Sequence, residues 1–251
     1  MARHHYGPHR DQHGSLRLPS PGAAGERHPV AVLLHGGSWR TRYGKIVLAP
    51  LAWDLARRGW ASWNLEYRRV GGRSGGGWRQ TGEDVLAGID LLAELDAPLD
   101  LGRVVVIGHS AGGQLALWSA AERGDGQGAV RVGAVVAQAA PSDLERSARN
   151  GAPSIERFMG GHPDVVPERY RDASPVERVP LGVPQLLVHG DHDRIVGFGT
   201  SERYADRARA AGDEVTLAKI EGASHLAHLN PRGEAWATAL DWLARWGPGA
   251  G

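Results

Sequence analysis

Short apolar runs alternate along the chain with longer stretches in which apolar residues recur every three or four positions. The short runs are rich in branched aliphatic residues, as in Val104-Val105-Val106-Ile107, which is typical of strands buried on both faces. Strands that alternate with amphipathic helices predict an α/β fold with a mostly parallel, doubly wound sheet flanked by helices. The predicted strands are Val30–Leu34, Trp60–Leu65, Arg103–Ile107, Val132–Ala137, Gln185–Val188 and Val215–Ile220.

The longer stretches have the apolar spacing of helices that cover such a sheet. Near the N-terminus, Leu16–Leu18 marks a candidate first strand ahead of this alternating series. The predicted helices are Ala49–Arg58, Thr81–Leu95, Ala111–Arg123, Ser201–Ala211 and Arg232–Trp246.

Two stretches depart from the alternation. Residues 71–77 form the glycine-rich sequence GGRSGGG after a predicted strand, at the sheet edge where open α/β sheets bind ligands. This loop is either a mobile rim of a pocket or a plain solvated connection. Residues 141–184 are far longer than a usual connection between a strand and the next element, so they should contain structure of their own. We predict a lid insertion there.

Length and composition narrow the class of protein. A chain of 251 residues suits one large α/β domain, and its formal net charge of +1 gives no reason to expect a nucleic-acid or membrane partner. The absence of cysteine excludes disulfides, a thiolate nucleophile and cysteine-ligated metal. Residues 1–19 lack the apolar core of a signal peptide, and no apolar run is long enough to span a membrane. We therefore expect a cytoplasmic protein that acts on a small molecule; its oligomeric state is not predicted.

The candidate chemistry begins at Gly108-His109-Ser110-Ala111-Gly112, a G-x-S-x-G motif directly behind a predicted strand and ahead of a predicted helix. This context is how a serine hydroxyl is held on a sharp turn as a nucleophile. A serine nucleophile needs a base within hydrogen-bond distance, and that base needs an acid to orient it. Both partners should follow Ser110 in the chain, in the order acid and then histidine.

Acid and histidine occur where that order requires them. Asp193 follows the predicted strand Gln185–Val188 in an H-G-x-x-D spacing and is our predicted acid, with Asp191 as the alternative. His225 follows the predicted strand Val215–Ile220 and is our predicted base, with His228 as the alternative. Each residue lies in the loop after its own strand, and parallel strands bring such loops to one sheet edge.

Acyl transfer also requires backbone N–H groups directed at the developing oxyanion. The amide of Ala111 follows the predicted nucleophile at a helix N-terminus, whose partial positive charge favours an anion. The turn His35-Gly36-Gly37-Ser38-Trp39 directly follows the predicted strand Val30–Leu34. Gly37 or Ser38 is the predicted second donor. Trp39 then either forms a wall of the pocket or packs in the core.

These residues resemble the α/β-hydrolase superfamily over roughly residues 30–246. Within it, the H-G-G-S-W turn and the serine motif look like small esterases related to hormone-sensitive lipase, BD-FAE-type feruloyl and carbohydrate esterases, and kynurenine formamidase. The resemblance implies a triad of Ser110, Asp193 and His225. The hormone-sensitive lipase pattern has a third glycine where Ser38 stands, which favours the other two branches. Many relatives have proline where this chain has Gly197, a minor departure.

We therefore predict a serine hydrolase that cleaves carboxylic esters of short-chain or aryl acyl groups, with no cofactor. The triad does not distinguish esters from aryl formamides, so an arylformamidase is the alternative. The predicted pocket residues are Trp39, His109, Phe158 and Met159, although Phe158 and Met159 also suit simple packing of a lid helix.

Two other classes of protein remain as alternatives. Imidazole and carboxylate groups in residues 189–193 suit zinc, but no H-E-x-x-H helix or dense histidine cluster accompanies them, and we expect no metal. A non-catalytic protein with this fold is the second alternative. Such proteins usually lack a triad member, whereas this chain has a candidate for all three positions.

Overall fold

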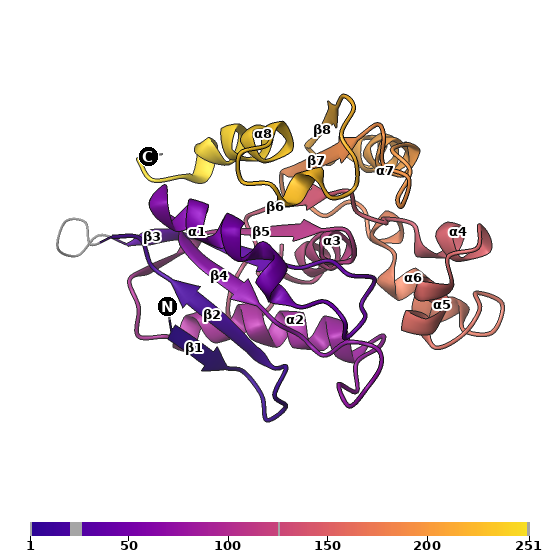
Figure 1. Cartoon of the computed structure of the whole chain (residues 1–251), viewed down its shortest axis with the longest axis horizontal. Coiled ribbons are helices and arrows are strands. Elements are labelled where there is room, and N and C mark those ends of the chain that lie inside the picture. The colour runs from indigo at the N-terminus through magenta and orange to yellow at the C-terminus, as the bar shows by residue number, and fades with distance from the viewer. Residues whose placement is uncertain (1, 21–26, 125, 250–251) are drawn as a thin grey trace.

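Eight strands form one sheet in the order β1-β2-β4-β3-β5-β6-β7-β8 (Figure 1). The computed structural model describes residues 2–20, 27–124 and 126–249. The six strands from β4 to β8 in this order run parallel, whereas β1 and β2 form an antiparallel hairpin at one edge. The strands are β1 (Ala2–His5), β2 (His13–Arg17), β3 (His28–Leu34), β4 (Ala61–Leu65), β5 (Leu99–His109), β6 (Ala134–Gln138), β7 (Gln185–Gly190) and β8 (Val215–Ile220).

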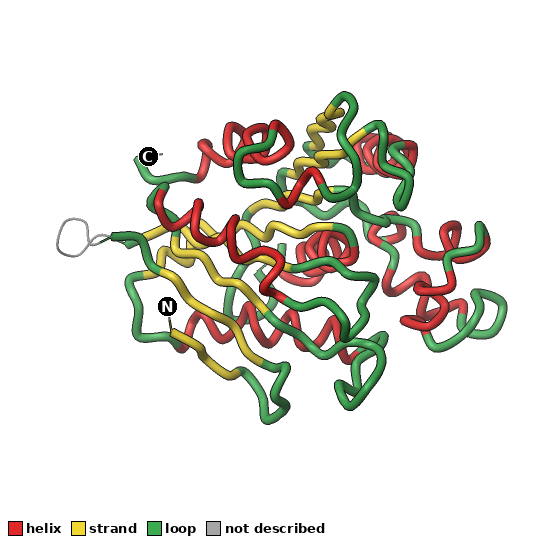
Figure 2. Tube along the Cα trace, viewed as in Figure 1, coloured by secondary structure: helices red, strands yellow, loops and turns green. Residues whose placement is uncertain are grey.

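Helices cover both faces of the sheet, as Figure 2 shows. Helices α1 and α8 pack on one face, and α2, α3 and α7 pack on the other. The doubly wound, mostly parallel sheet that the apolar pattern predicts is therefore confirmed. The helices are α1 (Ala49–Arg57), α2 (Gln80–Asp90), α3 (Ala111–Arg123), α4 (Leu144–Arg149), α5 (Pro153–Met159), α6 (Pro167–Ala173), α7 (Gly199–Ala210) and α8 (Glu234–Leu243), with 3-10 turns η1 (Lys45–Leu48), η2 (Leu91–Glu94), η3 (Pro175–Glu177), η4 (Ala227–Leu229) and η5 (Ala244–Trp246).

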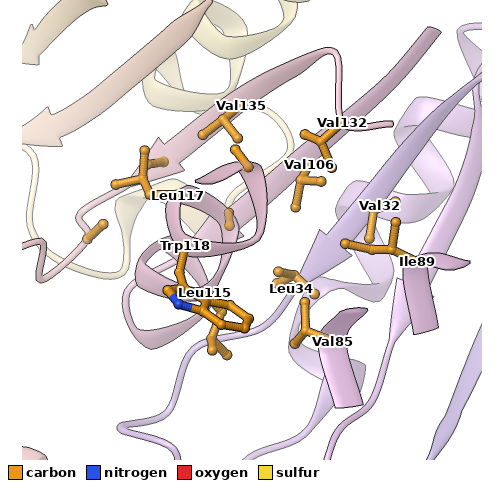
Figure 3. Close-up of a cluster of buried hydrophobic side chains, with 14 of the residues drawn as sticks. Val32, Leu34, Val85, Ile89, Val106, Leu115, Leu117, Trp118, Val132 and Val135 are labelled. Atoms are coloured by element: carbon orange, nitrogen blue, oxygen red, sulfur yellow. The ribbon is translucent and has the colours of Figure 1, made fainter. Parts of the chain in front are cut away.

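The strand β3 explains why this sheet needs helices on both sides. All seven of its residues are buried, and its side chains alternate between the two faces. Val32 and Leu34 belong to the larger core cluster, which also contains Val106 of β5 and Trp118 of α3 (Figure 3). Leu33 belongs to the cluster beneath α1 and α8. Burial on both faces fixes the register of the central strands, and with it the position of the loops that follow them.

The N-terminal hairpin extends the sheet beyond the predicted strands. The candidate strand at Leu16–Leu18 is present as β2, shifted toward the N-terminus, and it pairs with β4. Strand β1 was not predicted, because its sequence Ala-Arg-His-His lacks an apolar pattern and its residues are largely exposed. None of the helices in the described part of the chain is long and apolar enough to cross a membrane.

The glycine-rich loop 71–77 connects β4 with α2, and one buried residue anchors it although four of its seven residues are exposed. Ser74 is 1% exposed, and its hydroxyl donates to Asp11 Oδ2 at 2.6 Å while accepting from the amide of Arg69 at 2.8 Å. A side chain at Gly76 would meet the Arg68 carbonyl carbon at 2.3 Å, so glycine is required there by the close approach of the backbone. The loop is thus fastened to the N-terminal hairpin.

The predicted insertion, residues 141–184, contains the short helices α4, α5 and α6, which are grouped at one end of the molecule (Figure 1). Helix α4 begins at an N-cap, Asp143, whose carboxylate accepts from the amide of Arg146 at 2.9 Å. Helices α5 and α6 each begin with a proline, which is preorganised for the first helical turn. Three short helices replace the long irregular loop that the segment's length would otherwise imply.

Candidate active site

Ser110 lies on a sharp turn between β5 and α3. Its backbone has φ 54° and ψ −121°, a conformation that a non-glycine residue adopts only when the surrounding structure enforces it. The flanking glycines are required by close packing: a Cβ at Gly108 would lie 2.0 Å from the carbonyl oxygen of Gly112, and a Cβ at Gly112 would lie 2.0 Å from that of Leu34. The G-x-S-x-G spacing therefore follows from the contact of α3 with β3 and β5.

Ser110, His225 and Asp193 form a continuous chain of hydrogen bonds. The Oγ atom of Ser110 lies 2.9 Å from Nε2 of His225, and Nδ1 of His225 lies 2.7 Å from Oδ2 of Asp193. The three residues follow β5, β8 and β7, so the parallel sheet brings their loops to one edge. Each is 7% exposed. The structure thus brings together the three residues that the sequence singles out.

Asp193 is held as a carboxylate by four donors. Its Oδ1 accepts from the amides of Ile195 and Val196 at 2.8 and 2.9 Å, and its Oδ2 faces His225 and, at 3.2 Å, Nε2 of His189. Burial raises the pKa of Asp193, but the hydrogen bonds from the two histidines and the two amides outweigh it and hold the pKa well below its usual range. A permanent negative charge therefore lies behind the His225 imidazole.

The alternative acid and base have other environments. Asp191 is exposed, and its Oδ1 accepts from the amide of Gly222 at 2.7 Å. His228 is fully buried, and its ring lies 5.8 Å from that of His109. Burial, with a smaller contribution from the charge on His109, lowers the pKa of His228 to about 3. Neither residue contacts Ser110.

The turn after β3 lies at the same sheet edge, with Gly37, Ser38 and Trp39 all at positive φ. Beneath it, Nε2 of the buried His35 lies 2.8 Å from Oε1 of Glu66, whose other oxygen accepts from the amide of Lys45 at 3.1 Å. Burial raises the pKa of Glu66, but the hydrogen bond and charge of His35, the charge of Arg69 and the Lys45 amide together outweigh it, so the net pKa is lowered. This pair was not predicted. The signal was an acidic residue immediately after a buried strand.

A cavity of about 420 Å³ opens beside Ser110. Its wall includes Ser38, Trp39 and Ala111, together with residues from segments 141–155 and 195–200. Ala111 is the first residue of α3, where backbone N–H groups have no intrahelical acceptor. None of the described residues that line the cavity carries a formal charge.

Trp39 lines this cavity and is also part of the core. Its ring stacks on Phe158 at 4.4 Å, and its Nε1 donates to Gln114 Oε1 at 3.2 Å. Phe158 and Met159, predicted as pocket residues, do not line the cavity, because α5 turns both side chains into the core, where they are 1% and 0% exposed. The apolar wall from the insertion is supplied by Ile155 instead.

His109 is likewise absent from the cavity wall, which corrects its prediction as a pocket residue. Its side chain points behind Ser110, and its Nε2 donates to the backbone carbonyl of His225 at 2.8 Å. Burial, with a smaller contribution from the charge on His225, lowers the pKa of His109 to about 4. His109 therefore remains a neutral donor at neutral pH and ties the His225 loop to β5.

The histidine and aspartate side chains of residues 189–193, which were considered as zinc ligands, do not lie in one cluster. His189 and Asp193 are buried, while Asp191 and His192 are exposed. Within residues 2–20, 27–124 and 126–249, no group of three or more histidine, aspartate or glutamate side chains has the arrangement to hold a metal ion.

The parallel sheet, the serine turn and the order of the three loops agree with the family match, which places the chain in the α/β-hydrolase superfamily. The chain belongs to the prolyl oligopeptidase family, whose family model matches residues 58–248. Among curated proteins it is similar to esterase LipC of Mycobacterium tuberculosis, with 27% identity over 229 residues that cover 78% of this chain and 52% of that protein. The chain thus spans about half the length of the curated relative it matches.

Two solved esterases share the fold. A truncated carbohydrate esterase from gut microbiota superposes with a TM-score of 0.84 at 18% identity, covering 98% of this chain and 95% of that one. Esterase 2 of Thermogutta terrifontis superposes with a TM-score of 0.78 in its butyrate-bound form, at 21% identity and covering 95% and 91% of the two chains. The same enzyme phosphoramylated by tabun gives a TM-score of 0.79 at 21% identity, covering 97% and 93%.

Proposed function

We propose that the protein is a serine hydrolase that cleaves carboxylic esters of short-chain or aryl acyl groups. The observation that carries the proposal is the hydrogen-bonded chain from Ser110 through His225 to Asp193 at the edge of an uncharged cavity. A serine hydroxyl is a weak nucleophile at neutral pH, and an adjacent imidazole with a buried carboxylate behind it is the arrangement that activates it.

In the first half of the reaction, Ser110 Oγ attacks the ester carbonyl carbon while His225 Nε2 accepts the hydroxyl proton. The carbonyl π electrons move to oxygen, which gives a tetrahedral oxyanion. Asp193 keeps the proton of neutral His225 on Nδ1, leaving Nε2 free to act as a base, and it stabilises the imidazolium that forms. Collapse of the intermediate breaks the ester C–O bond, and the imidazolium returns its proton to the departing alcohol.

The amide of Ala111 and an amide from Gly37 or Ser38 are the proposed donors to the oxyanion. Ser38 and Ala111 both line the cavity beside Ser110, and the positive φ angles of Gly37 and Ser38 turn the backbone away from extended geometry. Preorganised backbone donors of this kind stabilise the charge that develops on oxygen without reorganising. In the second half, water attacks the acyl-enzyme with His225 as the base, releasing the acid and restoring Ser110.

The cavity supports a small, uncharged acyl group. Its volume of about 420 Å³ is closed on one side by Trp39, which the stacking on Phe158 holds in place. The names of the relatives agree with ester cleavage, since LipC is an esterase and the Thermogutta enzyme is recorded with butyrate and in a form phosphoramylated by tabun. Polar side chains on the wall, such as Ser147 and Ser154, make the cavity compatible with polar leaving groups as well.

The arylformamidase alternative makes a different demand on this cavity. N-formylkynurenine carries an ammonium and a carboxylate at neutral pH, and burying such charges without partners is costly. The described lining supplies no counter-charge for either group. We therefore expect neutral p-nitrophenyl esters to be hydrolysed with a higher kcat/KM than N-formylkynurenine, and assaying both substrates side by side distinguishes the two activities.

The proposal is tested by steady-state hydrolysis of p-nitrophenyl acetate and butyrate by the wild type, Ser110→Ala and Asp193→Asn. We expect Ser110→Ala to lower kcat/KM by about 10⁴-fold or more, with a smaller loss for Asp193→Asn. Ser119→Ala is the matched control, because Ser119 is a buried serine of α3 whose hydroxyl donates to the carbonyl of Ala116 in the same helix at 2.9 Å. Wild-type turnover by Ser110→Ala would refute the mechanism.

A further inference from the structure

Asp193 is contacted by a second buried histidine that the proposed mechanism does not use. Nε2 of His189 lies 2.8 Å from the carbonyl oxygen of Val196 and 3.2 Å from Oδ2 of Asp193. Both of these groups are acceptors, so Nε2 must carry a proton. His189 is 0% exposed, so these contacts lie away from the protein surface. Its N–H donates to the Val196 carbonyl, and the same Nε2 atom lies 3.2 Å from the carboxylate oxygen that faces His225.

The other ring nitrogen of His189 contacts Ser201 in α7. Nδ1 of His189 lies 2.7 Å from Ser201 Oγ, and Ser201 is 3% exposed. In neutral imidazole only one nitrogen carries a proton, so Nδ1 accepts and the Ser201 hydroxyl donates. A donor at this position selects the tautomer that places the His189 proton toward Asp193.

These contacts extend the chain of hydrogen bonds from α7 to the serine turn. We propose that Ser201 and His189 are positioning residues that fix the orientation of the Asp193 carboxylate toward His225. This inference rests on the proposed function, in which Asp193 orients the base. Two amides hold Oδ1 of Asp193, whereas Oδ2 depends on the two histidines, so loss of the His189 contact leaves Oδ2 fixed by His225 alone.

Substitution of Ser201 tests this chain of hydrogen bonds more directly than substitution of His189 does. The carbonyl that His189 binds belongs to Val196, a residue of the cavity wall, so substitutions of His189 disturb substrate binding as well. Ser201 does not line the cavity. Removing its hydroxyl leaves Nδ1 of His189 without a donor in a buried site, which is costly and weakens the tautomer preference.

The experiment compares Ser201→Ala and Ser201→Thr with the wild type in p-nitrophenyl butyrate hydrolysis. We expect Ser201→Ala to lower kcat by about tenfold, the size of effect typical of a lost hydrogen bond in a charged network, with KM within about twofold. Ser201→Thr keeps a hydroxyl and should recover most of kcat. Ser119→Ala is the buried-serine control and should match the wild type.

A second measurement does not depend on turnover. The proton shared between His225 Nδ1 and Asp193 gives a strongly downfield ¹H NMR signal, assigned by its loss in His225→Gln. We expect that signal to move upfield or broaden in Ser201→Ala and in His189→Leu, and to be retained better in His189→Gln, which keeps a side-chain N–H donor. If the wild type proved inactive on esters, the proposed function would fail while this signal still tested the chain of hydrogen bonds.

An unchanged kcat and an unchanged downfield signal in Ser201→Ala would overturn the inference. So would a Ser201→Thr variant that folds but recovers neither quantity. Should Ser201→Ala not fold, the comparison of His189→Gln with His189→Leu decides, because equal signals in those two variants would show that the His189 contact with Asp193 is unimportant.

Discussion

Trp39 shows how a single residue joins the cavity to the core. Its indole lines the cavity, but it is only 2% exposed, and its ring is held by stacking on Phe158 and by a hydrogen bond to Gln114. The backbone of Trp39 also adopts a positive φ of 53°, which a bulky residue reaches only under constraint. The stacking, the hydrogen bond and the backbone conformation together hold Trp39 in place, so we expect it not to move aside for a larger substrate.

We predict that Trp39→Leu shifts the preference of the enzyme toward longer acyl chains. Removing the indole enlarges the cavity beyond its present volume of about 420 Å³, so the ratio of kcat/KM for p-nitrophenyl octanoate to that for the acetate should rise by about tenfold, consistent with one or two additional buried methylenes. Kinetics over a series of p-nitrophenyl esters measures it.

The control for this prediction is Trp53→Leu, which replaces a tryptophan that is 55% exposed on α1 and does not line the cavity. Its chain-length profile should match that of the wild type. An unchanged profile in folded Trp39→Leu would mean that another part of the wall limits the acyl chain.

At the scale of the elements, the contact between α3 and the strands β3 and β5 creates the serine turn. Helix α3 approaches so closely that the positions of Gly108 and Gly112 have no room for a Cβ. The first turn of the helix is thereby brought next to the end of β3, where the turn containing Ser38 begins. One packing contact thus positions Ser110 and the proposed oxyanion donors together.

We predict that Gly112→Ala destabilises the protein by several kcal/mol, about 3 or more, because a methyl group 2.0 Å from the Leu34 carbonyl oxygen forces α3 away from β3. Esterase activity should fall by more than the loss of folded protein explains, since the serine turn moves with the helix. Urea unfolding and active-site titration measure the two effects. Gly133→Ala is the control: its Cβ would meet its nearest neighbour at 3.4 Å, an ordinary contact.

The elements whose bounds were predicted well have clear sequence signals at their ends, such as the serine motif before α3 and Gly124 after it. Helix α3 begins and ends at the predicted residues, Ala111 and Arg123, and β8 has the predicted bounds of Val215 and Ile220. The short helices of the insertion were not placed, because each has only six or seven residues, too few to show a helical period, and helices this short depend on tertiary packing. Strand β1 lacks any apolar pattern and forms by pairing with β2.

The same distinction holds for the site. Ser110, Asp193 and His225 were found because motif, strand position and chain order act together on them. The contacts around these three residues were not predicted. Nothing in the sequence pairs His35 with Glu66, 31 positions away, or His189 with Ser201, 12 positions away. Likewise, α5 contains three apolar or aromatic residues, Ile155, Phe158 and Met159, whose direction, into the core or toward the cavity, depends on how the helix packs.

At the scale of the whole molecule, the sheet edge that carries the site also concentrates buried histidines. His109 and His228 lie behind His225, and neither ring nitrogen of His228 has a hydrogen-bond partner among the described residues. Their pKa values are lowered from 6.5 to about 4 and about 3, mainly by burial. The folded protein therefore resists protonation at two positions where the unfolded chain accepts it.

We predict that the free energy of unfolding decreases as the pH falls from about 6.5 toward 4. In that window the unfolded chain binds protons on both histidines that the native state does not, so stability rises with pH, by about 1.4 kcal/mol per pH unit for each histidine. Asp193 acts at lower pH: its lowered pKa stabilises the folded state above its ordinary value of 3.8, and this contribution is lost as the pH falls further. Urea unfolding at pH 7, 6 and 5 measures the slope.

The variant His228→Leu separates these contributions. It removes a buried imidazole without partners, so stability at pH 7 should rise by about 1 to 3 kcal/mol, and the decline between pH 6 and 5 should become shallower by about 1.4 kcal/mol. Ester hydrolysis should persist, because His228 contacts neither Ser110 nor Asp193. His192→Leu, at an exposed histidine of the acid loop, is the control and should leave the stability at pH 7 within about 0.5 kcal/mol of the wild type. A slope that is the same in His228→Leu and the wild type would show that His228 binds its proton equally in both states, and a loss of activity would return it to consideration as the base.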